Sequence, residues 1–384
     1  MNERTDGRHE TTSGPFFATN FFVWPFIAAA AAGDTLAAQA GEMARALSWS
    51  PPASPRPARL DWCSPNRVRL ELSTMDLRDF STAEATREVP VLVCAPFALH
   101  CATIADLAPG HSLVETLARH GCRRLFLTDW RSATAEMRFL TIDSYLAELN
   151  VAIDEVGAPV DLVGLCQGGW MALVYAARFP NKVRKLVLAG APIDIAAAAS
   201  RLSVAAQNLP LSVFDQLTRL GDGRLQGRHA LELWEPALQS DEVAAALQVA
   251  PGELSRRPML RDRFALWSAS TLDLPGAFYH QSVLWLFKEN RLAQGRFVAL
   301  GRQIDLGAVR HPLFLLAAQG DRVAPTEQLM AVRRLVGTRP HDIESVVEPG
   351  NHLSLFVGAI TLRGAWSRAA RWLAASSAAT SLAA

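Results

Sequence analysis

The chain has 384 residues, of which 50% are apolar and 20% are charged. This composition argues against wholesale disorder, and the length fits one large domain with an insertion or two modest domains. The formal net charge of +1 gives no indication that the chain binds nucleic acid or a strongly anionic surface.

The N-terminal region contains the one membrane-like stretch, FFATNFFVWPFIAAAAAG at 16–33. Asn20 and Pro25 interrupt this stretch, and a spanning helix needs roughly 20 predominantly apolar residues. We therefore expect a helix that packs on the body, on a partner or on a hydrophobic particle. The following SWSPPASPRPA, at 48–58, is typical of a linker, so residues 1–60 are predicted to be an apolar segment with a proline-rich linker.

The body of the chain alternates apolar runs with helical patterns, which predicts a mainly parallel sheet with helices on both faces. The strand-like runs lie at 66–75, 89–99, 123–130, 159–165, 182–192, 311–321 and 343–352. Helical patterns lie at 111–120, 141–156 and 168–179. The stretch 195–300 loses the alternation and is expected to be a mostly helical cap. The predicted catalytic core therefore comprises residues 61–194 and 301–384.

The five cysteines form no C-x-x-C pair, and their number is odd. They are Cys63, Cys94, Cys101, Cys122 and Cys166. No signal peptide is visible, so reduced thiols in a cytoplasm are expected. No cluster of histidine and cysteine has the spacing of zinc ligands.

One cysteine stands in the sequence DLVGLCQGGWMAL, residues 161–173, where an apolar run precedes the thiol and a helical pattern follows it. The G-x-C-x-G spacing is typical of a nucleophile elbow between a strand and a helix, which favours a nucleophilic Cys166 over a buried structural cysteine. The helix beginning at Gln167 would direct its N–H groups and positive dipole end toward the sulfur. We predict oxyanion donors at the N–H of Gln167 and, in the loop CAPFALH, of Phe97 or Ala98.

A thiol nucleophile needs a base, and the base needs an acid that orients it. In α/β-hydrolase folds the acid and then the histidine follow the nucleophile along the chain. Asp321 follows the strand at 311–321, and His352 follows the last strand, so they are the predicted acid and base. Asp129 and Asp194, also at strand ends, remain alternative acids.

Two further histidines, His100 and His111, lie near the expected mouth of the site. We expect them to be surface or loop residues. The predicted fold is therefore α/β, an α/β-hydrolase fold with a mainly parallel central sheet and an inserted helical cap.

The sulfur of Cys166 bears on the reaction type. An acyl group on a cysteine is itself a thioester, so it retains the energy of an incoming thioester and can pass downhill to an alcohol. This chemistry favours acyl transfer over simple hydrolysis.

The segment GLCQGG resembles the G-x-C-x-G-G box of the polyhydroxyalkanoate synthases, particularly the short class that works with a second subunit. The resemblance extends from about residue 88 to about residue 360. Further similar segments are VPVLVCAPFALHCATIADLAPGHSLVETLARHG, LFLTDW, STLDLPGAFYHQSVLWLFKENRLAQGRF, GDRVAPTEQ and GNHLSLFVG. At the matching positions, the resemblance implies that Cys166 is the acyl carrier, His352 the general base and Asp321 the orienting acid.

The resemblance also implies a substrate and a setting. The substrate would be 3-hydroxyacyl-CoA, the product a polyester with release of coenzyme A, and no metal or prosthetic group would be required. A cytoplasmic enzyme is expected, in contact with the polyester chain or granule surface and with a second synthase subunit or a further copy of itself. Two other classes remain: a polyester depolymerase or thioesterase that uses the same triad, and a non-catalytic granule protein, which a broken triad would favour.

Overall fold

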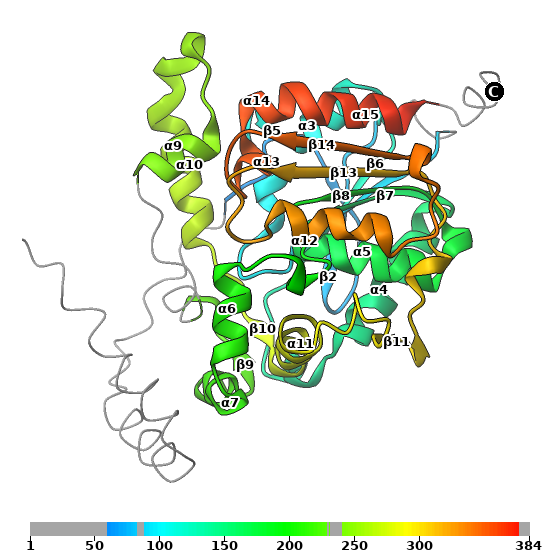
Figure 1. The fold of residues 1–384 in the computed structure, drawn as a ribbon. Coiled ribbons are helices and arrows are strands. Elements are labelled where there is room, and N and C mark those ends of the chain that lie inside the picture. The colour runs from blue at the N-terminus through cyan, green and yellow to red at the C-terminus, as the bar shows by residue number, and fades with distance from the viewer. Residues whose placement is uncertain (1–59, 83–87, 229, 231–239, 376–384) are drawn as a thin grey trace, which may run out of the picture. The chain divides into compact units, whose positions relative to one another are not determined.

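A computed structural model describes residues 60–82, 88–228, 230 and 240–375 (Figure 1). Its contacts divide the chain into two units, one of Met1–Pro52 with Leu209–Gln216 and one of Ala53–Asn208 with Leu217–Ala384. The predicted apolar segment at 16–33 and the linker at 48–58 lie outside the described residues. The larger unit carries the predicted site residues.

Eight strands of the described residues form one sheet in the order β1-β2-β6-β3-β7-β8-β13-β14. The strands are β1 (Arg67–Glu71), β2 (Met75–Asp79), β3 (Val91–Cys94), β6 (Leu125–Trp130), β7 (Val160–Leu165), β8 (Val183–Ala189), β13 (Leu313–Ala318) and β14 (Ile343–Glu348). From β6 to β14 all neighbouring strands are parallel, whereas β2 pairs antiparallel with both β1 and β6. The mainly parallel sheet predicted from the apolar runs is confirmed.

The central strands are buried along their whole length. Every residue of β3, β6, β7 and β13 is buried, because helices cover both faces of the sheet. Figure 1 shows α4 (Ile142–Val156), α5 (Gln167–Arg178) and α12 (Thr326–Met330) on one face, with α3 (Leu113–Arg119) and α15 (Ser367–Ala374) on the other. Parallel strands place their carboxyl ends at one edge, so the loops that follow β3, β7, β13 and β14 gather there.

One predicted strand is wrong in its extent. The run at 66–75 is the hairpin of β1 and β2, which reverses where the N–H of Leu72 donates to the carbonyl of Met75 at 2.9 Å. β1 is mostly exposed, and β2 alternates between buried and half-buried residues. The alternation of Val68, Leu70 and Leu72 changes phase at the turn and resumes at Met75 and Leu77, and a single strand predicted over 66–75 overlooked this shift.

Between β8 and β13 the described residues are mostly helical. The helices are α6 (Arg201–Asn208), α7 (Leu211–Leu220), α9 (Ser240–Leu247), α10 (Arg257–Ala269) and α11 (Gly276–Gln281), followed by a π-helical segment at Ser282–Lys288. The short strands β9 (Arg224–Leu225), β10 (Leu274–Pro275), β11 (Val298–Ala299) and β12 (Arg302–Gln303) form two small antiparallel pairs. The bounds given to the cap and the core stay predictions.

The remaining elements frame the predicted site. β4 (Asp106–Ala108) and β5 (His111–Ser112) form a short antiparallel pair before α3. After β14 come α13 (Ser354–Val357), α14 (Ala359–Thr361) and a π-helical segment at Leu362–Trp366. Among the described residues, no helix combines the length and the apolar character needed to cross a membrane.

Candidate active site

Cys166 occupies a sharp turn between β7 and α5. Its backbone has φ +49° and ψ −117°, a left-handed conformation that an L residue adopts only when the surroundings enforce it. The N–H of Cys166 donates to the carbonyl of Ala189 at 2.8 Å, and the Cys166 carbonyl accepts from the N–H of Gly169 at 2.9 Å. The turn is therefore held from both sides, and it presents a half-buried sulfur.

The glycine after the elbow permits a close approach of two loops. A Cβ at Gly168 would overlap the carbonyl oxygen of Cys94 and would lie 2.7 Å from that of Ala95. Only glycine lets the start of α5 pack so tightly on the end of β3. This contact brings the loop after β3 beside the nucleophile.

His352 and Asp321 meet at the same edge of the sheet. Asp321 lies just beyond β13 and His352 just beyond β14, and both are buried. The His352 Nδ1 and the Asp321 Oδ2 are 2.7 Å apart. The other carboxylate oxygen accepts from the N–H groups of Val323 at 2.9 Å and Ala324 at 2.8 Å. The carboxylate is thus fixed at both oxygens and can orient the ring.

The surroundings of His352 favour its charged form. Burial opposes protonation, but the Asp321 carboxylate, the charge of the Cys166 thiolate and the hydrogen bonds to both groups outweigh it. Together they hold the pKa of His352 well above its ordinary value. An imidazolium beside a sulfur is the arrangement that stabilises a nucleophilic thiolate.

The two alternative acids are engaged elsewhere. Asp129, at the end of β6, accepts from Arg78 Nε at 3.1 Å. Asp194 accepts from Asn290 Nδ2 at 2.7 Å and pairs with Arg334. Of the three acids considered from the sequence, the structure brings Asp321 to His352.

The expectation that the two other histidines are surface or loop residues is met by His100, a half-buried residue of the loop after β3, and is wrong for His111. The His100 ring packs on Trp267 with centroids 4.4 Å apart, and burial lowers the pKa of His100 to about 4. His111 is fully buried in β5, and its Nδ1 is 2.8 Å from the Val357 carbonyl oxygen. Such packing requires a neutral ring, and burial also lowers the pKa of His111.

The predicted oxyanion donors come from the two loops that Gly168 brings together. Gln167 is the first residue of α5, and Phe97 lies in the loop after β3. Neither of their N–H groups donates to a backbone carbonyl in a turn or loop of the described chain. An incoming carbonyl oxygen could therefore accept from both, and the donor role stays a prediction.

The sequence did not reveal what fixes the loop of Phe97. Its ring stacks on Tyr145 at 4.8 Å and also contacts Trp130 and Phe278. Trp130 Nε1 donates to the carbonyl of Ala95 at 2.7 Å. Trp130 ends the LFLTDW segment noted in the sequence, but its contact with the loop of Phe97 was not predicted. Contacts between side chains so far apart in sequence leave no periodic pattern.

A family model for the alpha/beta hydrolase fold matches residues 105–359, which include Cys166, Asp321 and His352. The "Poly(3-hydroxyalkanoate) polymerase subunit PhaC" of Haloferax mediterranei is 26% identical over 324 residues, covering 81% of this chain. This chain spans 64% of the length of that relative.

Two other relatives carry the same name. The protein from Allochromatium vinosum is 24% identical, covering 70% of this chain and 76% of its own length. The protein from Synechocystis sp. is 27% identical, and the match covers 70% of this chain and 74% of that relative's length. These relatives confirm the resemblance to polyhydroxyalkanoate synthases. The eight-stranded sheet, the cysteine elbow and the matching family model together establish that the chain belongs to the α/β-hydrolase fold family.

Proposed function

We propose that this chain is an acyltransferase that polymerises 3-hydroxyacyl-CoA into polyhydroxyalkanoate and releases coenzyme A. The observation that carries the proposal is a cysteine at the elbow, beside a histidine whose Nδ1 lies 2.7 Å from Asp321, in a chain similar to known polymerases. A cysteine acyl-enzyme retains the energy of the thioester, which suits transfer to an alcohol.

The proposed cycle has two half-reactions. In the first, the Cys166 sulfur attacks the thioester carbonyl while the N–H groups of Gln167 and Phe97 bind the oxyanion, and the protonated His352 gives its proton to the departing coenzyme A sulfur. In the second, neutral His352 takes the proton of a hydroxyl on the growing chain or next monomer. That oxygen attacks the Cys166 thioester, an ester forms, and the Cys166 sulfur leaves. No metal or prosthetic group enters the proposed cycle.

The proposal extends to the setting of the enzyme. It would work in the cytoplasm on a polyester chain or granule surface, with a second synthase subunit or a further copy of itself as partner. The apolar, aromatic-rich FFVWPF motif within residues 16–33 is the proposed contact for the partner or granule.

The identity of the acyl product tests the proposal. Full-length protein given 3-hydroxybutyryl-CoA, alone and with a synthase partner subunit, should release coenzyme A and form an ester-linked oligomer or polymer. Hydrolysis would release the same thiol, so the acyl product must be isolated and its length measured. Free 3-hydroxybutyrate as the sole product under both conditions would contradict the synthase proposal and favour a depolymerase or thioesterase.

A further inference from the structure

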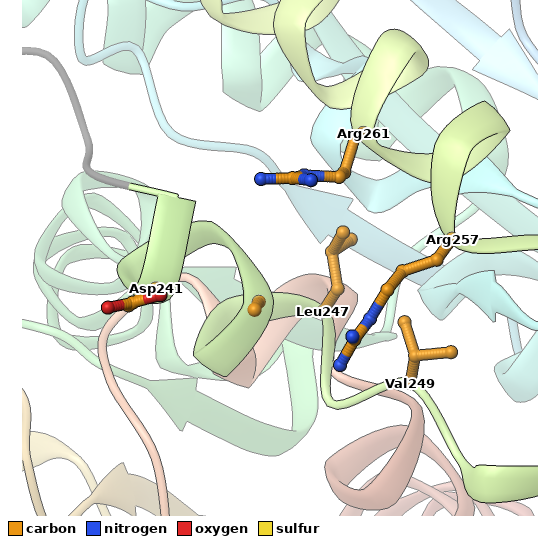
Figure 2. Close-up of a pocket in the computed structure, with 6 residues that line it drawn as sticks. Asp241, Leu247, Val249, Arg257 and Arg261 are labelled. Atoms are coloured by element: carbon orange, nitrogen blue, oxygen red, sulfur yellow. The ribbon is translucent and has the colours of Figure 1, made fainter. Parts of the chain in front are cut away.

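Four arginines, Arg256, Arg257, Arg261 and Arg263, lie just before α10 or in its first half. Arg256 Nη2 donates to the carbonyl of Pro109 at 2.6 Å, and Arg263 Nε donates to that of Leu107 at 2.6 Å. These two side chains attach α10 to the segment around β4. Arg257 and Arg261 are exposed, lie one helical turn apart on the same face and point toward α9 (Figure 2).

The space between α9 and α10 is a cleft of about 200 Å³. It is lined by Asp241, Ala244, Leu247, Val249, Arg257 and Arg261 (Figure 2). A second, more open hollow of about 380 Å³ is lined by Arg257, Pro258, Arg261 and Asp262. The two guanidinium groups therefore border both hollows, and the half-buried Ala244 and Val249, backed by the buried Leu247, give the cleft an apolar wall.

The cleft adjoins the loop that carries His352. α9 packs against α13, which begins just after His352. In addition, Asn351 Nδ2 donates to the carbonyl of Glu242 in α9 at 3.2 Å. An anion held at the cleft would thus contact α9, the helix that also contacts the loop carrying His352.

We propose that Arg257 and Arg261 bind the phosphate groups of the acyl-CoA substrate. The inference rests on the proposed function and names a subsite for it. Coenzyme A carries a diphosphate and a 3′-phosphate at the end remote from its sulfur, and guanidinium groups bind phosphate oxygens in bidentate fashion. The apolar wall offers a surface for the adenine ring. Binding energy gained at this remote end positions the thioester at Cys166.

The test is a calorimetric titration of coenzyme A into full-length Cys166→Ala protein. Adding Arg257→Gln and Arg261→Gln should weaken coenzyme A binding by about tenfold or more, as expected for losing two charge-assisted contacts. The matched control carries Arg302→Gln and Arg310→Gln, which remove the same charge from two exposed sites elsewhere, and should bind like the parent. Equal affinity in both double variants would overturn the phosphate subsite.

Kinetics separate failure of the subsite from failure of the proposed function. With Cys166 intact, Arg257→Gln/Arg261→Gln should raise KM for 3-hydroxybutyryl-CoA and leave KM unchanged for its N-acetylcysteamine thioester, which has no phosphate. Wild-type turnover with an unchanged KM for the CoA substrate in the double variant would overturn the subsite alone. A wild-type protein that neither binds coenzyme A nor consumes either thioester would overturn the proposed function and the subsite with it.

A different observation concerns Gln248, directly after α9. Its backbone has φ +48°, an unusual left-handed conformation for a glutamine. Its side-chain Nε2 donates to the carbonyl of Pro349 at 3.0 Å, and its Oε1 accepts from both the N–H and the Oγ1 of Thr361, each at 3.1 Å. One amide therefore bridges the two ends of the segment that carries His352.

The segment is shaped to receive this amide. A Cβ at Gly350, which has φ +127°, would lie 2.8 Å from Gln248 Nε2, and a Cβ at Gly358 would overlap Oε1. From the opposite side, the N–H of Gly320 donates to the Gly350 carbonyl at 2.8 Å, which ties the segment to the loop of Asp321. The segment is thus fixed between α9 and the Asp321 loop.

We infer that Gln248 is a positioning residue that sets His352 against Cys166 and Asp321. Gln248→Ala should lower kcat for coenzyme A release by about tenfold, with little change in KM, because a misplaced base slows chemistry rather than binding. The rate of Cys166 alkylation by iodoacetamide should also shift in its pH dependence, which a general loss of stability would not cause in the folded fraction.

The controls keep the inference testable if Gln248→Ala folds poorly. Gln248→Glu retains an oxygen facing Thr361 but has no donor for Pro349, so it should fall between wild type and Gln248→Ala. Gln303→Ala, which removes an exposed glutamine that donates to the Gly295 carbonyl at 2.6 Å, should match wild type. Folded Gln248 variants with the wild-type kcat and alkylation profile would overturn the inference.

Discussion

Replacing Cys166 with alanine should abolish coenzyme A release from 3-hydroxyacyl-CoA and leave the fold intact. The change removes the sulfur that would carry the acyl group, and loss of a nucleophile that acts within a triad lowers turnover by at least about 10⁴-fold. Alanine is smaller than cysteine and fits a half-buried turn held by backbone hydrogen bonds. A thiol-release assay measures the turnover, and circular dichroism measures the fold.

Two other substitutions calibrate this result. Cys166→Ser should leave only a trace of activity, because an alkoxide is much harder to form than a thiolate with the same base. Cys122→Ala is the matched control, since burial raises the pKa of the Cys122 thiol to about 12 and keeps it unreactive. Wild-type turnover in folded Cys166→Ala would show that another group is the nucleophile.

Asp321→Asn should reduce turnover by about 10² to 10⁴-fold, as for the loss of the acid that orients a triad histidine. Acylation of Cys166 should survive in part, because the sulfur and the imidazole are both still present, although the ring loses the carboxylate that orients it. Steady-state rates of coenzyme A release measure the effect. Asp129→Asn and Asp194→Asn serve as comparisons, and a damaging change at either of them with a silent Asp321→Asn would contradict the choice of acid.

The same substitution has a consequence for stability against pH. Burial lowers the pKa of His352, and the Asp321 carboxylate is the largest of the causes that raise it well above its ordinary value. A raised folded-state pKa means that protonated His352 stabilises the fold below its unfolded-state pKa, and that this stabilisation is lost as pH rises through the folded-state pKa. In Asp321→Asn the pKa of His352 should fall, so the loss should begin at lower pH. The free energy of unfolding of both proteins, measured with denaturant from neutral to alkaline pH, tests this expected shift.

Much of the sheet could be predicted because its order is local in sequence. The runs that became β3, β6, β7 and β13 are mainly apolar, as strands buried on both faces must be, and the apolar positions of β8 and β14 were also recognisable as strand-like. The elbow at Cys166 could also be predicted from the sequence, because small residues must flank the nucleophile where α5 packs on β3. Asp321 and His352 could be located because parallel strands place their carboxyl ends at one edge.

The parts that escaped prediction depend on contacts between residues distant in sequence. His111 was expected to be a surface or loop residue, but it is buried in β5, where the carbonyl of Val357 gives its ring a partner. Gln248 belongs to no recognisable sequence motif. Its proposed role rests on hydrogen bonds between its side-chain amide and Pro349 and Thr361, which only the folded structure shows. The turn between β1 and β2 was missed because it has no glycine or proline, and its mark in the sequence is a shift in the phase of the apolar alternation at Ser73–Thr74.

Mass spectrometry of the protein during turnover tests the central claim, that Cys166 carries the growing acyl chain. Full-length protein is mixed with 3-hydroxybutyryl-CoA, quenched in acid and digested, and the peptide containing Cys166 is examined. We predict a ladder of masses on that peptide, separated by one hydroxybutyrate unit and absent from Cys166→Ala. An unmodified Cys166 peptide while coenzyme A is released, or a single acyl unit that decays only to the free acid, would contradict it.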